Sequence, residues 1–347
     1  MTTRDQLVLA LPGAHALACV RCMSASPPLI AVVMPVFNEE AVLPQTFARL
    51  TALFAAQPQC RWQAILVNDG SRDRSLDLLR RQEAADPRFR TVELSRNFGF
   101  QAALAAGLAE AADAAAVVTM DADLQDPPEV IPALVDAWHQ GAEVVLAVRR
   151  SRQETGLRRL GMDTFHACFG RLTDTPLIDS NAGTFCLLDR AAVAVLLGLP
   201  ERHRYFPGLR AWVGFNVAQV PYDRQERAAG KPQQTFVRLL RYALDGLFSF
   251  SRLPLRLVTY AGLFVSGVGF SLGAFYVTRR LLGIEHAQTG FTTLAVLILF
   301  LGGVQLIGIG VLGEYLGRIY DEVKQRPLYV VKRRPAAGSD RRTPPAP

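Results

Sequence analysis

From Leu29 onward, short apolar runs alternate with longer segments in which apolar residues recur at helical spacing. The short runs predict buried strands, and the segments between them predict helices. We expect strands at 29–35, 62–67, 89–94, 115–120 and 143–148, with helices at 39–55, 73–85, 101–112 and 128–139. Such alternation is typical of βαβ units and therefore predicts an α/β domain with a mostly parallel sheet.

The remainder of this domain is less regular. It comprises an Arg-rich amphipathic segment at 149–172, a strand-like segment at 183–188, a helix at 191–197 and a last segment at 215–220. Before the first strand, the apolar stretch at 7–20 is too short to cross a bilayer. We therefore interpret 1–28 as a variable N-terminal extension.

A narrow polar stripe marks the helix predicted at 235–252. Its polar residues recur every three or four positions on an otherwise apolar cylinder, at Arg238, Arg241, Asp245, Ser249 and Arg252. This pattern is typical of a helix that lies in a membrane interface. The alternative is an ordinary buried core helix, but the apolar segments that follow favour the membrane.

Two stretches of about 20 uncharged, mainly apolar residues, 257–277 and 291–313, are long enough to cross a bilayer as helices. Several glycines in each would permit close helix contact. The alternative is a pair of deeply buried core helices. Basic residues flank the outer ends of this hairpin, whereas the joining loop has only Arg279 and Arg280, partly offset by Glu285. The positive-inside bias then predicts that both long ends are cytoplasmic.

These patterns divide the chain into five parts. They are the extension at 1–28, a cytoplasmic α/β domain at 29–230, interface helices at 231–256, two transmembrane helices at 257–318 and a basic cytoplasmic tail at 319–347.

Charge and composition narrow the class of partner. The 347 residues carry a net charge of +7, and arginine greatly outnumbers lysine. Because no nucleic-acid motif or aromatic-interleaved basic stripe accompanies this charge, we expect lipid and phosphate partners rather than nucleic acid. The five cysteines lack the spacing of a zinc site and fit a reducing cytosol.

The strongest candidate for chemistry is Asp121-Ala122-Asp123, which follows an apolar strand and precedes Pro127-Pro128. Two acids at i and i+2 would point the same way from the carboxyl end of that strand, where open α/β sheets bind ligands. Carboxylates there suit Mg²⁺ or Mn²⁺ held together with substrate phosphates. The alternative is a plain acidic turn after a core strand.

The neighbouring motifs favour the metal. Seven motifs occur in the same order as in a known family. They are Met34-Pro35-Val36-Phe37-Asn38-Glu39-Glu40, Asn68-Asp69-Gly70-Ser71, Leu94-Ser95-Arg96-Asn97-Phe98-Gly99, Asp121-Ala122-Asp123-Leu124-Gln125-Asp126, Leu199-Pro200-Glu201-Arg202, Ala211-Trp212-Val213-Gly214 and Gly313-Glu314-Tyr315-Leu316. Across about residues 29–331 the chain resembles the family 2 polyprenyl-phosphate glycosyltransferases, the dolichyl-phosphate mannose synthase and bacterial undecaprenyl-phosphate glucosyltransferase type. The resemblance implies a GT-A fold, a nucleotide-sugar donor, a divalent metal, a lipid-phosphate acceptor and a homo-oligomer.

The resemblance also implies roles for the residues at the strand ends. The nucleotide would lie among Pro35, Asn38, Glu40 and Asp69. Carboxylates there can accept hydrogen bonds from a base or a ribose. The alternative for Asn38 and Asp69 is turn formation and helix capping.

At the acids, Asp121 would contact the donor through ribose or metal, and Asp123 and Gln125 would be metal ligands. Asp121 and Asp123 are thus the expected catalytic residues. A metal would neutralise the diphosphate leaving group.

The acceptor phosphate would meet arginines. Those that match the family in position are Arg149, Arg158, Arg159 and Arg227. Arginine makes bidentate phosphate contacts. The alternative is that these arginines simply meet anionic lipid headgroups.

Three departures from the family pattern bear on the donor. Asn68 replaces an acid, Lys231-Pro232-Gln233 replaces Glu-Ser-Lys, and Gly183-Thr184-Phe185-Cys186 replaces Gly-Asp-Phe-Arg. An acid and an arginine near the expected sugar pocket are therefore missing.

The leading hypothesis is an inverting transferase of the cell inner membrane. It would move one hexose, with glucose from UDP-glucose as the expected donor, to undecaprenyl phosphate on the cytoplasmic face. Other hypotheses are the same reaction with GDP-mannose or a UDP-aminosugar, a processive polysaccharide synthase, and an inactive nucleotide-binding scaffold.

Overall fold

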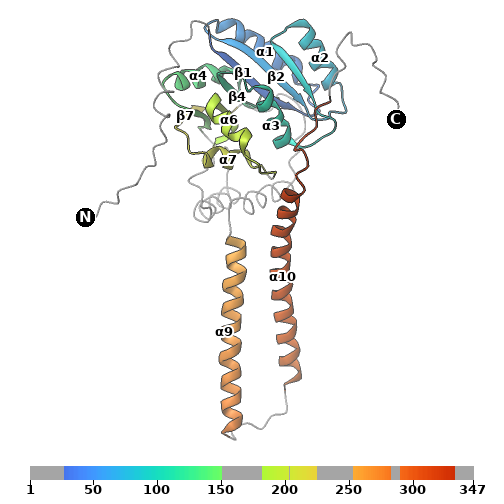
Figure 1. The fold of residues 1–347 in the computed structure, drawn as a ribbon, viewed down its shortest axis with the longest axis vertical. Coiled ribbons are helices and arrows are strands. Elements are labelled where there is room, and N and C mark those ends of the chain that lie inside the picture. The colour runs from blue at the N-terminus through green and yellow to red at the C-terminus, as the bar shows by residue number, and fades with distance from the viewer. Residues whose placement is uncertain (1–26, 151–181, 203, 225–252, 283–289, 333–347) are drawn as a thin grey trace, which may run out of the picture.

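The computed structural model describes residues 27–150, 182–202, 204–224, 253–282 and 290–332. Figure 1 shows an α/β domain from which two long helices extend on one side. The first 26 residues of the predicted extension and the predicted interface helix at 235–252 lie outside the described residues, as do Arg158, Arg159 and Arg227.

A seven-stranded sheet forms the centre of the domain, in the order β3-β2-β1-β4-β6-β5-β7. The strands are β1 (Leu29–Val36), β2 (Arg61–Asn68), β3 (Phe89–Glu93), β4 (Ala116–Thr119), β5 (Val144–Arg149), β6 (Ala182–Asp189) and β7 (Val217–Tyr222). Only β6 is antiparallel to its neighbours β4 and β5. The prediction of a mostly parallel sheet is therefore confirmed.

Helices cover both faces of the sheet, because alternate strand residues point to opposite sides. On one face α1 (Leu43–Ala56) and α4 (Ile131–His139) pack against Ile30 and Val32 of β1. On the other, α3 (Phe100–Glu110), α6 (Arg190–Gly198) and α7 (Phe206–Trp212) pack against Ala31 and Val33. The remaining helices of the domain are α2 (Ser75–Ala85) and the short η2 (Pro128–Val130).

Two helices differ most from the sequence prediction. Helix α7 was not expected, because it has only seven residues and begins with Phe206-Pro207-Gly208. Proline is favoured in a first helical turn, so the Pro-Gly pair here starts a helix rather than a loop. The second long helix, α10 (Phe291–Val323), continues ten residues beyond the apolar run that ends at Gly313. An ion pair between Arg318 and Glu314 at 3.1 Å supports this extra length.

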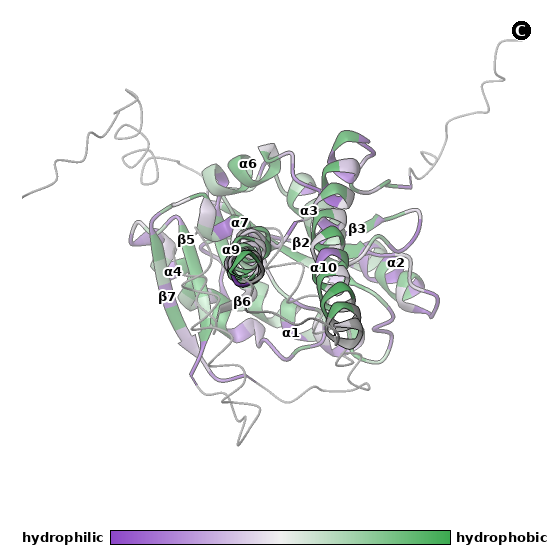
Figure 2. Ribbon diagram, turned by 90° about the horizontal axis from the view of Figure 1, so that it is seen from below, coloured by the Kyte–Doolittle hydropathy of each residue, from purple (hydrophilic) through white to green (hydrophobic). Residues whose placement is uncertain are grey.

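The long helices α9 (Leu253–Leu281) and α10 contain two candidate membrane spans, Leu257–Phe275 and Phe300–Val323. By length and composition both can cross a membrane, and 0% and 6% of their respective residues are buried. Seen from below in Figure 2, both helices lie under the α/β domain and are largely hydrophobic. Their exposed apolar surface argues against the alternative of buried core helices. The two helices approach at Gly308, where an added Cβ would lie 3.2 Å from Val258.

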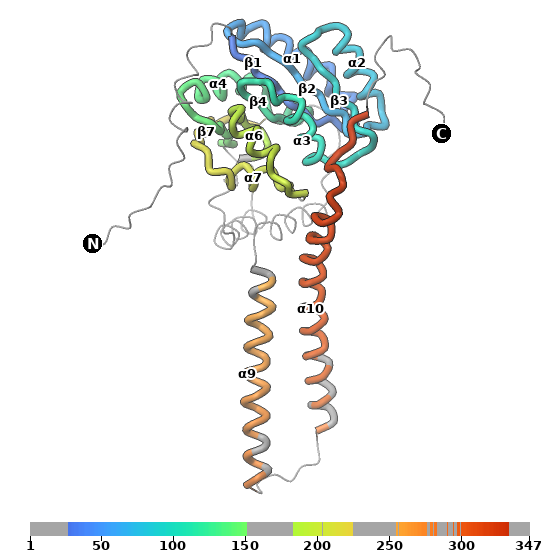
Figure 3. The backbone as a smooth tube through the Cα atoms, viewed as in Figure 1, coloured from blue at the N-terminus to red at the C-terminus, as the bar shows by residue number. Residues whose placement is uncertain are grey.

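The segment Lys324–Lys332, here called the strap, returns from α10 to the sheet. It runs beside β3 in Figure 3, where Val331 pairs with Leu94 and Lys332 donates a backbone hydrogen bond to Glu93 at 2.8 Å. The Lys332 ammonium also contacts the Glu93 carboxylate at 2.9 Å. The strap thus covers the exposed edge of β3 and joins α10 to the sheet.

Candidate active site

The topology brings the predicted site residues to one edge of the sheet. Strands β1, β2, β4, β5 and β7 run in the same direction, so their carboxyl ends meet there, together with the amino end of antiparallel β6. The described residues of the predicted site lie at or just beyond these ends; they are Pro35, Asn38, Glu40, Asp69, Asp121, Asp123, Gln125 and Arg149.

The loop after β4 is a turn held by specific hydrogen bonds. Leu124 has a φ of 58°, which is uncommon for a residue other than glycine. The backbone N–H of Gln125 donates to Asp123 Oδ1 at 3.1 Å, and Thr46 of α1 donates to the Ala122 carbonyl at 3.2 Å. Asp123 is buried, whereas Asp121 is partly exposed. This loop, residues 121–126, is called the acid turn below.

A third acid anchors the acid turn to the far side of the sheet. Asp126 is 1% exposed and accepts a hydrogen bond from the Tyr222 hydroxyl at the end of β7. Arg149 Nε donates to the same hydroxyl at 3.2 Å. Arg224 Nε lies 3.7 Å from Asp126, and its Nη2 donates to Gln125 Oε1 at 2.6 Å. Residues 96 or more apart in sequence therefore meet at this turn.

Three carboxylates lie close together in the acid turn, and this raises the pKa of one of them. Burial, together with the negative charges of Asp126 and Asp123, raises the pKa of the Asp121 carboxyl to about 7, although Arg224 and Arg149 oppose the shift. Each effect disfavours a second or third negative charge in a region of low dielectric. A cation or a cationic ligand at this turn would therefore be stabilised.

The residues present fit a divalent cation of the kind that shares its ligands with a substrate. Within the described parts of the chain, no group of three or more His, Cys, Asp or Glu residues could hold a metal ion by itself. Mg²⁺ is commonly bound by one or two carboxylates plus substrate phosphates, which is what Asp121 and Asp123 can offer. Because Arg224 already occupies the Gln125 amide oxygen, ligation by Gln125 would require Arg224 to move.

The residues predicted to border a nucleotide link neighbouring loops. The Asn38 side-chain oxygen accepts from the Arg72 backbone N–H at 2.8 Å, and Asn38 itself has a φ of 56°. The Glu40 carboxylate accepts from the Arg74 backbone N–H at 3.0 Å. Pro35 is partly exposed near the end of β1. Asn38 and Glu40 therefore hold the loop after β1 against the loop after β2, and their binding role stays a prediction.

Asp69 is held more firmly. Its two carboxylate oxygens accept from the backbone N–H groups of Phe98 and Gly99 at 2.7 and 2.9 Å. Burial raises the pKa of Asp69, and these two hydrogen bonds partly offset the shift. Asp69 therefore fixes the loop between β3 and α3, and each oxygen keeps one further lone pair for a ligand.

In the Gly183–Cys186 segment, which departs from the family pattern, one side chain borders the site and another lies in the core. The Thr184 hydroxyl lies 3.5 Å from Asp121 Oδ1, so Thr184 borders the acid turn. Cys186 is fully buried beside Thr119 and does not reach the site. Arg210 of α7 is also buried and donates to the Gly183 carbonyl at 3.0 Å, which holds the amino end of β6.

Four residues of this arrangement were not predicted from the sequence: Asp126 in its pairing role, and Tyr222, Arg224 and Arg210 altogether. Tyr222 is the last residue of a strand that was predicted to end at residue 220, and Arg224 lies two residues beyond it. The available signal was the polar Tyr222-Asp223-Arg224 run directly after an apolar strand.

Comparisons with known proteins agree with this architecture. Residues 31–197 match glycosyl transferase family 2, and residues 253–319 match the GtrB C-terminal hairpin. The chain is 42% identical over 305 residues to the SfII prophage-derived bactoprenol glucosyl transferase of Shigella flexneri, covering 88% of this chain and 97% of that one. It is 40% identical over 305 residues to the prophage bactoprenol glucosyl transferase homolog of Escherichia coli (strain K12), with 88% and 98% covered.

Among solved structures, the glucosyl-3-phosphoglycerate synthase of Mycobacterium tuberculosis has a TM-score of 0.43 and 20% identity, with 64% of this chain and 78% of that one covered. The α/β domain has the GT-A fold, as the sequence analysis predicted. From its sequence similarity to these relatives over nearly their whole length, the chain belongs to glycosyl transferase family 2.

Proposed function

We propose that this protein transfers a single glucose from UDP-glucose to undecaprenyl phosphate at the cytoplasmic face of the cell inner membrane. The observation that carries the proposal is the identity of about 40% to bactoprenol glucosyl transferases across both the α/β domain and the hairpin. The acid turn, bordered by arginines, supplies the chemistry that such a transfer requires.

In this proposal the donor lies along the carboxyl edge of the sheet. Pro35, Asn38, Glu40 and Asp69 would border the nucleotide, and the diphosphate would lie beside the acid turn. Asp123, with Gln125, would hold Mg²⁺ or Mn²⁺, which when bound offsets the negative charge of the diphosphate. Asp121 would contact the donor through ribose or the same metal.

The acceptor needs little activation by the protein. A phosphate monoester has a second pKa near 6, so its oxygen is largely ionised at neutral pH. One phosphate oxygen forms a bond to the anomeric carbon while the bond to the diphosphate breaks and UDP leaves with the electron pair. Direct displacement inverts the anomeric centre. Positioning and charge neutralisation therefore supply most of the rate acceleration.

Arginines supply the positive charge for the acceptor phosphate. Arg149 lies at the end of β5, 4.0 Å from Asp126 Oδ1, and Arg224 lies 3.7 Å from the same oxygen. We assign Arg149 to the acceptor, together with the sequence-predicted Arg158, Arg159 and Arg227.

The hairpin supports a reaction at a membrane. We propose that α9 and α10 span the bilayer with both chain termini in the cytoplasm, since basic residues flank the outer ends of the hairpin. The strap supports this arrangement because it attaches the end of α10 to the sheet that carries the site. On the family resemblance we also expect a homo-oligomer, which light scattering of the detergent-solubilised protein would test.

The test is product formation by the purified full chain. It is incubated with undecaprenyl phosphate and, in turn, labelled UDP-glucose, GDP-mannose and a UDP-aminosugar. The proposal predicts a lipid carrying one glucose, formed only with UDP-glucose. A polymer would support the processive synthase instead, another labelled lipid would identify a different donor, and nucleotide binding without turnover would support the inactive scaffold.

A further inference from the structure

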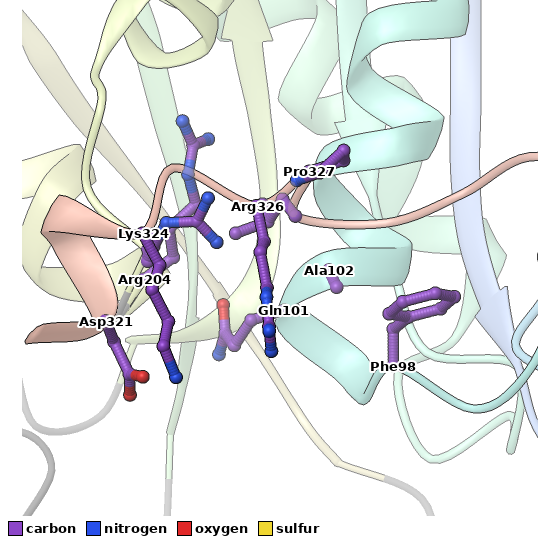
Figure 4. A pocket seen from close by; sticks show the side chains of 10 residues that line it. Phe98, Gln101, Ala102, Arg204, Asp321, Lys324, Arg326 and Pro327 are labelled. Carbon is purple, nitrogen blue, oxygen red and sulfur yellow. The ribbon is translucent and has the colours of Figure 1, made fainter.

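A second, basic pocket lies apart from the acid turn. It has a volume of about 240 Å³ and lies where the end of α10 and the strap meet the start of α3 and the segment between α6 and α7. Figure 4 shows Arg204, Lys324 and Arg326 beside Gln101 of α3. Its lining residues are Phe98, Gln101, Ala102, Arg202, Arg204, Asp321, Lys324, Arg326, Pro327 and Leu328. None of these residues belongs to the acid turn.

The lining carries an excess of positive charge. Four basic side chains face one acid, Asp321. The Arg204 guanidinium is held by the backbone, because its Nε and Nη1 donate to the carbonyls of Glu201 and Leu196 at 3.1 and 3.3 Å. In the described parts of the chain, neither Arg326 nor the Arg202 guanidinium has an ion-pair partner. A bound anion would therefore meet guanidinium groups that are free to turn toward it.

Two acids beside the pocket, Glu201 and Glu322, act electrostatically on Arg204 and reduce this charge without removing it. The Glu322 carboxylate accepts from the backbone N–H of Arg202 at 2.8 Å, so one of its oxygens faces the peptide chain. The Lys324 ammonium lies 3.8 Å from the centre of the Tyr320 ring, a contact that keeps its positive charge. Four positive groups and one negative group line the pocket, and an excess of one positive charge remains when Glu201 and Glu322 are counted as well.

The position of the pocket favours a lipid headgroup as the anion. The second candidate span ends at Val323, and Lys324 and Arg326 follow it directly. Tyr320, in the last turn of the span, is 59% exposed. Tyrosine and basic residues at the end of a span lie at the level of lipid headgroups, and basic pockets on the cytoplasmic side bind anionic ones. The volume is below that of pockets for drug-sized ligands and suits a small polar headgroup.

We propose that this basic pocket binds the phosphate of an anionic phospholipid of the inner leaflet. The lipid would hold the end of α10 against the first turn of α3. Phe98 and Gln101 come from the loop and helix that Asp69 also fixes, so the bound headgroup would brace the nucleotide side of the domain at the membrane surface. The inference rests on the proposed membrane insertion of α10, and it does not depend on the transferred sugar.

The test is binding of fluorescent phosphatidylglycerol to the full chain in neutral detergent. The pocket variant is Lys324→Gln with Arg326→Gln. The matched control is Arg61→Gln with Arg81→Gln, which removes two exposed arginines that do not line the pocket. Two cations near the membrane surface at about 1 kcal/mol each correspond to about a thirty-fold loss of affinity. We expect that loss in the pocket variant, near-normal binding in the control, and weak binding of phosphatidylcholine by every form.

Equal binding of phosphatidylglycerol by the pocket variant and the control would overturn the proposal. It would also be overturned if inorganic phosphate displaced the lipid at equal concentration, because the ligand would then be a free anion. Membrane extraction of each variant separately reports whether α10 inserts. Glucosyl transfer is assayed on the same preparations, so a failure of the proposed reaction is distinguishable from a failure of lipid binding.

Discussion

The hydroxyl of Tyr222 is the best place to test how the site is held together. It donates to the buried Asp126 carboxylate and accepts from Arg149 Nε at 3.2 Å. Burial and the adjacent Asp126 charge raise the pKa of Tyr222 above its ordinary value, so the hydroxyl keeps its proton. Tyr222→Phe removes only the hydroxyl. The ring keeps its edge-on contact with Phe185, with the two ring centres 5.6 Å apart.

The expected cost follows from the burial of Asp126. Hydrogen bonds to charged groups contribute about 1.5–3 kcal/mol, and a buried carboxylate that loses a donor bears the cost of its desolvation. Because Phe fills the same space as the Tyr ring, almost no cavity is created. In a domain of about 200 residues, 1 kcal/mol shifts Tm by about 2–4 °C, so Tyr222→Phe should lower Tm by about 3–12 °C.

The assay is thermal unfolding in detergent of wild type, Tyr222→Phe, Asp126→Asn and the double variant. Because both substitutions act on one hydrogen bond, the double variant should lose less stability than the two single variants added together. Tyr329→Phe is the control, since no hydrogen bond of its hydroxyl is seen among the described residues, and should shift Tm by no more than about 2 °C. An unchanged Tm in Tyr222→Phe, or strictly additive losses, would refute this view of the site.

Two further predictions concern the framework around the site. Gly107→Ala would place a Cβ 2.3 Å from a methyl group of Val33, so it should cost about 1–3 kcal/mol in thermal unfolding, whereas Gly198→Ala, which meets nothing within 4 Å, should be near neutral. A result in which both alanines are tolerated equally would show that α3 lies farther from the sheet. Although burial opposes ionisation of Glu93, hydrogen bonds from Lys332 and Arg80 hold its pKa below the ordinary value. That stabilisation is present above the unfolded-state pKa and is lost as pH falls. Lys332→Gln should therefore lower stability by up to about 1 kcal/mol at pH 7, with the deficit shrinking in acid; a deficit that grows in acid would contradict the assignment.

The fold followed from the sequence because strands of a parallel sheet are buried on both faces and so form continuous apolar runs. Val117 and Val118 of β4 are fully buried, and the acids directly after them had to lie at the carboxyl edge. Helix α7 escaped prediction because a helix of seven residues has too few turns to show periodicity.

The charge network of the site was not predictable from local pattern. Asp126 and Tyr222 are separated by 96 residues and meet only because β7 pairs with β5. Nothing near either residue encodes that strand order. By contrast, Asp121 and Asp123 were found because both follow one apolar run closely, which is a local signal, although they lie in the turn after β4 and not on an extended strand end as predicted. The family resemblance supplied the remaining assignments.

The central claim is that the acid turn binds the cation and donor for sugar transfer to a lipid phosphate. The most direct measurement is formation of glucosyl lipid by Asp123→Ala, with the exposed Asp113→Ala as the matched control. We predict that Asp123→Ala makes no detectable product while its Tm and membrane extraction match those of wild type, and that Asp113→Ala keeps normal activity. Near-normal product formation by Asp123→Ala would contradict the account.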